Sequence, residues 1–191
     1  MAKLIYAMNT SLDGYISDRE GDFGWGIPGR EFLEAINELE RGVGTYLYGR
    51  RLYETMAVWD AAHLEPGSAP FSPGNRDLER EFADMWRAAD KIVFSTRLSQ
   101  TSTTRTRIER AFEPERIRQL KATSERDLTV GGPHLAAAMI AANLVDEFHA
   151  FVHPVIIGGG TPFLPQNVRV PLELVGAQRL GRIVHMHYRR S

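Results

Sequence analysis

The residues best suited to chemistry surround two adjacent glycines, in the stretch Asp127-Leu128-Thr129-Val130-Gly131-Gly132-Pro133-His134-Leu135. The pattern predicts a short buried strand over Leu128 to Val130 and an Ala-rich helix that begins near Pro133, where a missing N–H costs nothing. Backbone without side chains at a helix N-terminus leaves N–H groups free to bind a phosphate. The alternative is a tight turn in which glycine serves only conformation or close packing.

Two other segments combine an apolar strand with basic or hydroxyl side chains. Gly49-Arg50-Arg51 lies between a strand and the next helix, where two guanidinium groups repel each other and the helix dipole unless an anion compensates. The alternative is that both arginines are solvated at the surface. Ser95-Thr96-Arg97 follows a strand that starts at Lys91, and its hydroxyls and guanidinium can bind a phosphate ester and stack on an adenine.

These segments must be positioned by alternating strands and helices. Apolar runs and turn residues predict strands at 4–8, 45–49, 91–97, 103–108, 128–130, 145–153, 172–177 and 182–188. Amphipathic or alanine-rich patterns predict helices at 30–41, from 50 onward, at 77–89, 114–123 and from 133 onward, while 61–75 is predicted irregular. This order predicts an α/β fold in three layers, α/β/α, with a mostly parallel central sheet and antiparallel C-terminal strands. We expect one domain over residues 1–191.

Strand ends at one edge of a parallel sheet form the usual ligand site of such folds. The three segments therefore predict a ligand with several phosphates, and NADPH has a pyrophosphate and a 2′-phosphate. The sequence has no Gly-x-Gly-x-x-Gly after the first strand and no Gly-Lys-Ser/Thr, so neither a Rossmann nor a P-loop site is indicated.

Composition narrows the possible partners and location. The formal net charge is −1, which does not favour nucleic acid or an anionic membrane as a partner, and the absence of cysteine excludes disulfides and thiolate chemistry. The N-terminal residues show no signal-peptide pattern and no apolar run reaches the length of a membrane span, so we expect a cytoplasmic protein.

At several of these motifs the sequence resembles the dihydrofolate-reductase-like superfamily. The resemblance is specifically to the reductase domain of bifunctional riboflavin-biosynthesis deaminase–reductases and to its stand-alone relatives. It covers nearly the whole chain and is carried by Ser11-Leu12-Asp13-Gly14, Gly49-Arg50-Arg51-Leu52-Tyr53-Glu54, Lys91-Ile92-Val93-Phe94-Ser95, Val130-Gly131-Gly132-Pro133-His134-Leu135-Ala136, and Leu144-Val145-Asp146-Glu147 through His153-Pro154-Val155 to Gly158-Gly159-Gly160-Thr161.

The resemblance implies a homodimeric, NADPH-dependent reductase acting on a small heterocyclic, pteridine- or pyrimidine-like, or sugar-derived substrate. It also implies a cis peptide between Gly131 and Gly132. The cofactor residues that it implies are Gly49, Arg50, Arg51, Ser95, Thr96, Arg97, Gly131, Gly132, Pro133, His134 and Leu135. No deaminase zinc motif is present, so a bifunctional role is excluded.

Candidate substrate residues lie at the other end of the predicted cofactor. Asp13 and Glu31 are the candidate catalytic proton donors, and Asn9 and Trp25 are the candidate substrate-binding residues. Where dihydrofolate reductases carry a buried carboxylate, this chain has Arg30 instead, with Glu31 next to it. The glycine-rich loop 21–29 carries large apolar side chains and is predicted to cover the pocket. The alternatives are a nucleotide-binding module without turnover and a dihydrofolate reductase with an altered acid.

Four histidines in the C-terminal strands could in principle bind a metal. His149 and His153 share one strand face, as do His185 and His187. No cluster of carboxylates at ligand spacing accompanies them in the sequence, so we expect ordinary sheet histidines and no metal site.

Overall fold

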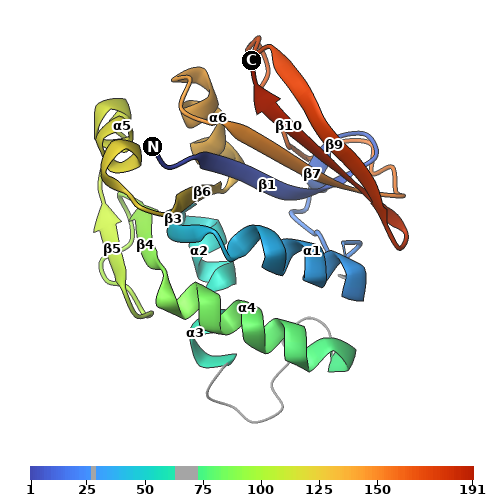
Figure 1. The fold of residues 1–191 in the computed structure, drawn as a ribbon, viewed down its shortest axis with the longest axis horizontal. Helices are drawn as coiled ribbons and strands as arrows, with labels where there is room; N and C mark the ends of the chain where they lie inside the picture. Colours follow the sequence, from blue (N-terminus) through green and yellow to red (C-terminus); the bar gives the residue numbers. More distant parts are fainter. Residues whose placement is uncertain (27–28, 63–72) are drawn as a thin grey trace.

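The computed structural model describes residues 1–26, 29–62 and 73–191, which are organised around an eight-stranded sheet (Figure 1). Its order is β5-β4-β3-β6-β1-β7-β10-β9, and all neighbours are parallel except β7–β10 and β10–β9. The strands are β1 (Leu4–Ser11), β3 (Val43–Gly49), β4 (Asp90–Phe94), β5 (Thr106–Glu109), β6 (Asp127–Gly131), β7 (Glu147–His153), β9 (Leu172–Leu180) and β10 (Ile183–Arg190). The predicted α/β fold, with a mostly parallel sheet and antiparallel C-terminal strands, is confirmed. Two short strands missed in the sequence, β2 (Tyr15–Ser17) and β8 (Thr161–Pro162), pair separately.

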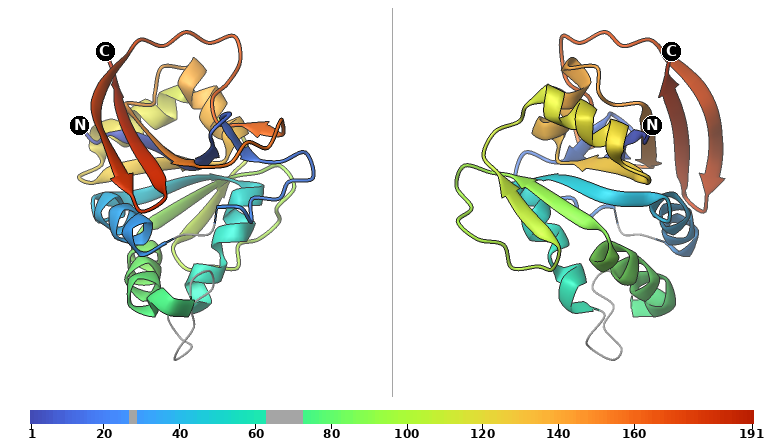
Figure 2. Two further views of the ribbon diagram at one scale, coloured as in Figure 1. Left: turned by 90° about the vertical axis from the view of Figure 1, so that its right-hand side faces the viewer. Right: turned by 60° about the vertical axis from the view of Figure 1, so that its left-hand side comes forward.

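Helices cover both faces of this sheet, as the views in Figures 1 and 2 show. One face carries α1 (Arg30–Glu40), α2 (Arg50–Met56), α3 (Val58–Ala62) and α4 (Arg76–Ala88), and the other carries α5 (Pro114–Thr123) and α6 (Pro133–Ala141). Of the stretch 61–75, which was predicted to be irregular, α3 reaches residue 62 and a short 3₁₀ turn spans Pro73–Asn75. The rest of that stretch lies outside the described residues. Among the described helices, none combines the length and the apolar character that crossing a membrane requires.

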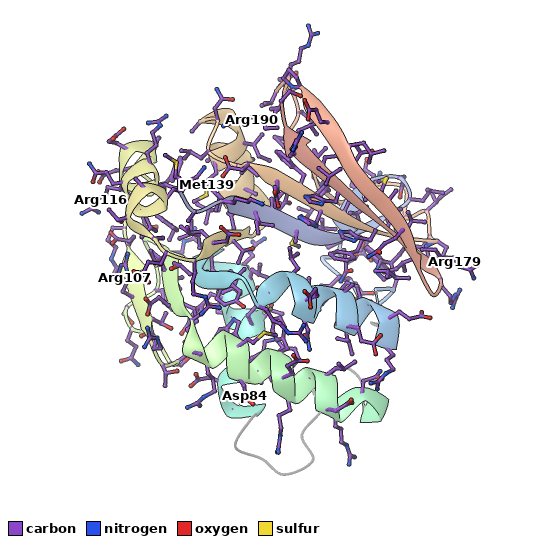
Figure 3. The ribbon with its side chains drawn as sticks, in the orientation of Figure 1. Asp84, Arg107, Arg116, Met139, Arg179 and Arg190 are labelled. Carbon is purple, nitrogen blue, oxygen red and sulfur yellow. The ribbon has the colours of Figure 1, made fainter. Side chains whose placement is uncertain are left out.

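The two faces of the sheet bury two separate apolar clusters. The α5–α6 side includes Tyr6 and Met139, and the α2–α4 side includes Trp59, Phe82 and Trp86. Met139 points from α6 toward the sheet, whereas Asp84 of α4 and Arg116 of α5 project away from it (Figure 3). Central strands β3, β6 and β1 are buried over most of their length because both of their faces are covered.

Charged groups are also buried inside these layers. Lys91 is fully buried, its Nζ donates to the carbonyl oxygens of Trp86 at 2.8 Å and Ala89 at 2.9 Å, and the ammonium lies 4.2 Å from the Trp86 ring centre. Burial lowers the pKa of Lys91 to about 8. Lys121 donates to the carbonyl oxygen of Leu144 at 2.8 Å and pairs with Asp146 at 2.5 Å. Both lysines therefore hold backbone segments in place through buried hydrogen bonds to carbonyl oxygens.

The glycine run at residues 158–160 serves the fold rather than leaving a free turn. Gly160 has φ +131°, and a Cβ there would overlap the carbonyl oxygen of Ser17 and the backbone of Asp18. Only glycine allows the segment before β8 to approach the end of β2 so closely. The described contacts of this glycine run are therefore with another part of the chain.

Candidate functional site

The three predicted anion-binding segments follow adjacent parallel strands. β3 pairs with both β4 and β6, with Gly49 opposite Phe94 and Tyr48 opposite Gly131. The segments that leave these strands therefore emerge side by side at one edge of the sheet, as the sequence predicted from strand polarity.

The β6–α6 junction brings two backbones together. Gly132 has φ +98° and ψ 123°, and a Cβ there would lie 3.6 Å from the nitrogen and 3.7 Å from the Cα of Gly49. A Cβ at Gly131 would instead overlap the Leu52 side chain and lie 2.8 Å from the Tyr48 ring. The two glycines are thus required for different reasons, because Gly131 serves internal packing and Gly132 serves a left-handed backbone at the strand end.

The predicted cis peptide between Gly131 and Gly132 is wrong. No cis peptide bond occurs in the described part of the chain, and the positive φ of Gly132 turns the backbone instead. The amide of Ala136 donates to the Gly132 carbonyl at 2.9 Å and no side chain caps α6. Because the first amides of a helix have no partner within it, the N–H groups of His134 and Leu135 remain available for an anion.

The basic side chains at this edge differ in how they are engaged. Arg50 Nη1 contacts both carboxylate oxygens of Glu54, at 2.8 Å and 2.7 Å, so an internal acid already compensates its charge. Arg51 and Arg97 are exposed, and neither forms an ion pair within the described residues. These two guanidinium groups are therefore the ones free to meet a phosphate.

The segment after β4 is shaped by its own hydroxyl and by an arginine that the sequence reasoning missed. The buried Ser95 hydroxyl accepts hydrogen bonds from the amides of Arg97 at 3.1 Å and Leu98 at 2.9 Å. Arg110 donates to the carbonyl oxygens of Ser95 at 2.9 Å and Leu98 at 2.6 Å. Thr96, between Ser95 and Arg97 in the sequence, is exposed. Ser95 therefore fixes the turn that presents Thr96 and Arg97.

A cavity of about 440 Å³ lies between α2 and the chain that follows this turn. The hydroxyl of Tyr53 accepts from the Ser102 amide at 3.0 Å and lies 3.1 Å from the Thr103 hydroxyl, which holds the two walls together. The cavity is lined by Tyr53, Glu54, Ala57, Leu98, Ser99, Gln100, Thr101 and Ser102. The lining residues follow two of the predicted cofactor segments in sequence, and none of the predicted cofactor residues themselves lines the cavity.

A second cluster forms where β1 and β7 end. His153 Nε2 donates to Asn9 Oδ1 at 3.1 Å, which leaves the amide NH₂ of Asn9 free to donate to another group. The Trp25 ring packs edge-on against His153 with 5.5 Å between centres, and Trp25 Nε1 is buried without a hydrogen-bond partner in the described chain. Burial lowers the pKa of His153 below its ordinary value of 6.5, so the ring is neutral near pH 7. The structure thus joins the two predicted substrate residues through a histidine that the sequence reasoning assigned to the sheet.

Asp13 lies next to this cluster in sequence and braces a loop. Its carboxylate accepts from the amides of Gly158 at 2.8 Å and Ile157 at 3.2 Å. A hydrogen bond from the Ser11 hydroxyl, with those two amides, lowers the pKa of Asp13 below its ordinary value. The side chain is solvent-exposed. An ionised carboxylate held this way is suited to positioning the 157–158 backbone and poorly suited to donating a proton at neutral pH.

The start of α1 does not place a buried carboxylate toward this cluster. Glu31 is exposed and lies against Gly181 in the β9–β10 turn, while Arg30 pairs with Glu34 at 2.9 Å and Asp77 at 3.2 Å. Arg30 is therefore held by acids of α1 and α4. Residues 27 and 28 of the predicted covering loop lie outside the described residues.

Comparison with known proteins is consistent with these features. Residues 2–186 match the family model of the RibD C-terminal domain. A relative from Bacillus subtilis (strain 168), the uncharacterized protein YyaP, is 27% identical over 180 residues, covering 92% of this chain and 88% of the relative.

Two solved structures share the fold at low sequence identity. A putative riboflavin biosynthesis protein from Shewanella sp. PV-4 has a TM-score of 0.74 at 19% identity and covers 100% of this chain and 99% of its own. Dihydrofolate reductase from Enterococcus faecalis, in a complex with NADP(H), has a TM-score of 0.60 at 18% identity and covers 99% of this chain and 96% of its own. The fold is therefore dihydrofolate-reductase-like, and the chain belongs to the RibD C-terminal domain family.

Proposed function

We propose that this protein is an NADPH-dependent reductase that transfers a hydride to a small heterocyclic, pteridine- or pyrimidine-like, or sugar-derived substrate. The observation that carries the proposal is the meeting of the Gly49 and Gly132 backbones beside the free amides of α6, with Arg51 and Arg97 nearby in the adjoining segments. The glycine approach and free amides suit a pyrophosphate, and the two guanidinium groups suit a further phosphate.

The second cluster supplies hydrogen-bond donors for the substrate end of the site. Hydride transfer needs a positioned electrophilic carbon, exclusion of water and one proton. Asn9 Nδ2 and Trp25 Nε1 are the donors without partners here, so they would orient acceptor atoms of a flat polar ring, with His153 holding Asn9 in place. NADPH, held by the Gly49 and Gly132 backbones and the amides of His134 and Leu135, would supply the hydride for such a reduction. Asp13 and Glu31 stay candidates for acid–base roles, with Asp13 better placed to order the 157–158 backbone.

Enzyme and binding module are separated by one assay on the purified protein. Loss of reduced-nicotinamide absorbance is followed with pteridine, folate and ribosylaminopyrimidine substrates, and NADPH binding is titrated in parallel by fluorescence. Turnover with any of them supports the reductase. Tight NADPH binding without turnover on a panel of such substrates would instead support a nucleotide-binding module. That alternative is favoured by Arg30, which stands where dihydrofolate reductases carry a carboxylate and is paired with Glu34 and Asp77.

We expect NADPH to bind more tightly than NADH. One charge-assisted contact to the 2′-phosphate contributes about 1.5–3 kcal/mol, which is roughly a ten- to hundredfold difference in Kd. Arg51→Gln and Arg97→Gln should each narrow this preference, whereas Arg50→Gln should change it less because Glu54 already pairs with Arg50. Fluorescence titration of both cofactors against the four proteins measures the preference. Equal affinities of the wild type for both cofactors would remove the 2′-phosphate role from these arginines.

We also propose a twofold-symmetric homodimer that uses the C-terminal sheet edge. β9 is an edge strand that pairs only with β10 within the described residues, and along it Leu174 is 61% and Val175 50% exposed. An apolar edge of this kind is normally covered. Light scattering at micromolar concentration should give twice the chain mass, and Leu174→Lys should shift it to the chain mass. A wild type that scatters as a single chain would contradict the proposal.

A further inference from the structure

One face of strands β7 and β10 brings a carboxylate and two imidazoles together. His149 lies opposite His187 in the antiparallel register, and Glu147 lies two residues before His149 on the same face. Glu147 Oε2 is 3.7 Å from His149 Nε2 and 3.4 Å from His187 Nε2. The three candidate ligand atoms all lie within 4.8 Å of one another. Grouping the histidines strand by strand in the sequence hid this arrangement, because it pairs residues across two strands.

The two imidazole nitrogens that face Glu147 form no well-aligned hydrogen bond in the described part of the chain. Nε2 of His149 and Nε2 of His187 are both buried without a hydrogen bond in the described part of the chain, and the His149 side chain is only 5% exposed. An unsatisfied buried polar atom costs about 1–3 kcal/mol, so native structures seldom leave two of them beside one carboxylate oxygen. An ion that contacts all three atoms would satisfy them at once.

We propose that Glu147, His149 and His187 bind one divalent transition-metal ion, with Zn²⁺ as the best match. Imidazole nitrogen and carboxylate oxygen bind Zn²⁺ at about 2.0–2.2 Å, which places neighbouring ligand atoms of a tetrahedral site about 3.3–3.6 Å apart. The separations of 3.4 Å and 3.7 Å are close to that spacing. Two nitrogens and one oxygen leave a fourth position for water, and they disfavour Mg²⁺ and Ca²⁺, which prefer oxygen alone.

Neighbouring side chains orient the three ligands. His149 Nδ1 is 2.9 Å from His185 Nε2, and a proton on that Nδ1 leaves the Nε2 lone pair of His149 for a metal. The Gln178 amide lies 3.4 Å from His185 Nδ1, and after an amide flip its carbonyl oxygen can accept the hydrogen bond that this Nδ1–H donates. Lys3 binds the other oxygen of Glu147 at 2.8 Å, which holds Oε2 toward the histidines.

The arrangement also shows what must change as an ion binds and where it enters. The rings of His149 and His187 stack with 4.0 Å between centres, so they must tilt until both Nε2 lone pairs point at one ion. The His187 side chain is 23% exposed, which provides the entry path. His149 precedes His153 by four residues, about 13 Å along β7, so the site is separate from the substrate cluster. A bound ion would link the C-terminal antiparallel strands to the parallel sheet.

The test uses tag-free protein stripped of metal by a chelator, titrated with Zn²⁺ by calorimetry and with Co²⁺ by visible absorption. We expect one ion per chain, a tetrahedral Co²⁺ spectrum and a melting temperature that rises with Zn²⁺, because an ion that binds only the folded chain stabilises it. His187→Ala and Glu147→Gln should each weaken binding by at least about tenfold and remove the rise in melting temperature. His134→Ala, at an exposed histidine on α6, should bind Zn²⁺ as the wild type does.

Circular dichroism establishes that each variant is folded. If His187→Ala does not fold, the Zn²⁺ affinity of Glu147→Gln, which keeps the side-chain shape, tests the proposal instead. Less than one ion per wild-type chain would overturn the proposal. So would equal Zn²⁺ affinity in the wild type and in the folded variants, because it would place the ion elsewhere.

Discussion

Gly132→Ala is expected to abolish NADPH binding while leaving most of the fold intact. An alanine at φ +98° is strained by about 1–3 kcal/mol, and its methyl group would fill the gap where the Gly132 and Gly49 backbones meet. The contacts of this methyl group with the protein are ordinary ones, the shortest at 3.6 Å, so the folded chain tolerates it. A pyrophosphate that must approach the same backbone would be excluded by it. The strain is a fraction of a typical stability of about 5–15 kcal/mol.

Two neighbouring comparisons make this result specific. Gly131→Ala forces a methyl against Leu52 and Tyr48, so it should lower the melting temperature more than Gly132→Ala does. Gly176→Ala places its methyl group in open space on β9, so it should change neither the melting temperature nor the rise that NADPH causes. Melting temperature with and without NADPH is measured for all four proteins. If NADPH raises the melting temperature of Gly132→Ala as much as that of the wild type, the junction is a packing turn and the cradle interpretation is wrong.

Glu40→Gln is expected to stabilise the protein at alkaline pH by about 3 kcal/mol. Glu40 is buried at the end of α1, and burial raises the pKa of its carboxyl from 4.5 to about 7 despite an opposing contribution from the Tyr46 hydroxyl. Glu40 Oε2 and the Tyr46 hydroxyl both lack a well-aligned hydrogen-bond partner in the described chain. A neutral amide of the same shape avoids the cost of ionising this site.

The direction of the pH dependence follows from proton binding. Between pH 4.5 and about 7 the folded chain holds a proton on Glu40 that the unfolded chain has released, so the free energy of unfolding falls as pH rises. The Glu40 contribution is fully favourable below pH 4.5 and lost above about pH 7. At 1.36 kcal/mol per pKa unit the loss is about 3 kcal/mol.

Urea denaturation at a series of pH values between 5 and 8 measures this slope. The difference between Glu40→Gln and the wild type should be small at the acid end and largest at pH 8. Glu38→Gln, on the same helix but with its side chain 73% exposed, should show little pH-dependent difference. A Glu40→Gln protein that is less stable than the wild type at pH 8 would show that the ionised carboxylate is tolerated.

The fold could be predicted because its local signals agree with its long-range order. β3, β4 and β6 each contain a short apolar segment that is followed by a glycine or a hydroxyl residue, and burial on both faces of a parallel sheet favours such segments. β2 and β8 could not be found this way. They are three and two residues long, and they pair only because Gly160 lets two distant loops touch.

In the candidate site, too, local sequence signals predicted some features and could not predict those that depend on contacts between distant residues. Strand polarity alone was enough to place Gly49, Ser95 and Gly132 at one edge. It could not show that Arg50 is already paired with Glu54, because an i,i+4 acid is equally compatible with a free arginine. Nor could it show His153 beside Asn9 or His149 beside His187, because both contacts depend on the register between separate strands.

The buried lysines also determine how the folded chain meets amine-reactive reagents. The sequence has three lysines, Lys3, Lys91 and Lys121, and the latter two are buried with their ammonium groups on backbone carbonyls. Acylation of the folded protein is therefore directed to Lys3 and the α-amino group of Met1, and label at residue 91 or 121 reports opening of the interior. Because arginine does not react with such reagents, capping these amines leaves the charges of all twenty arginines in place.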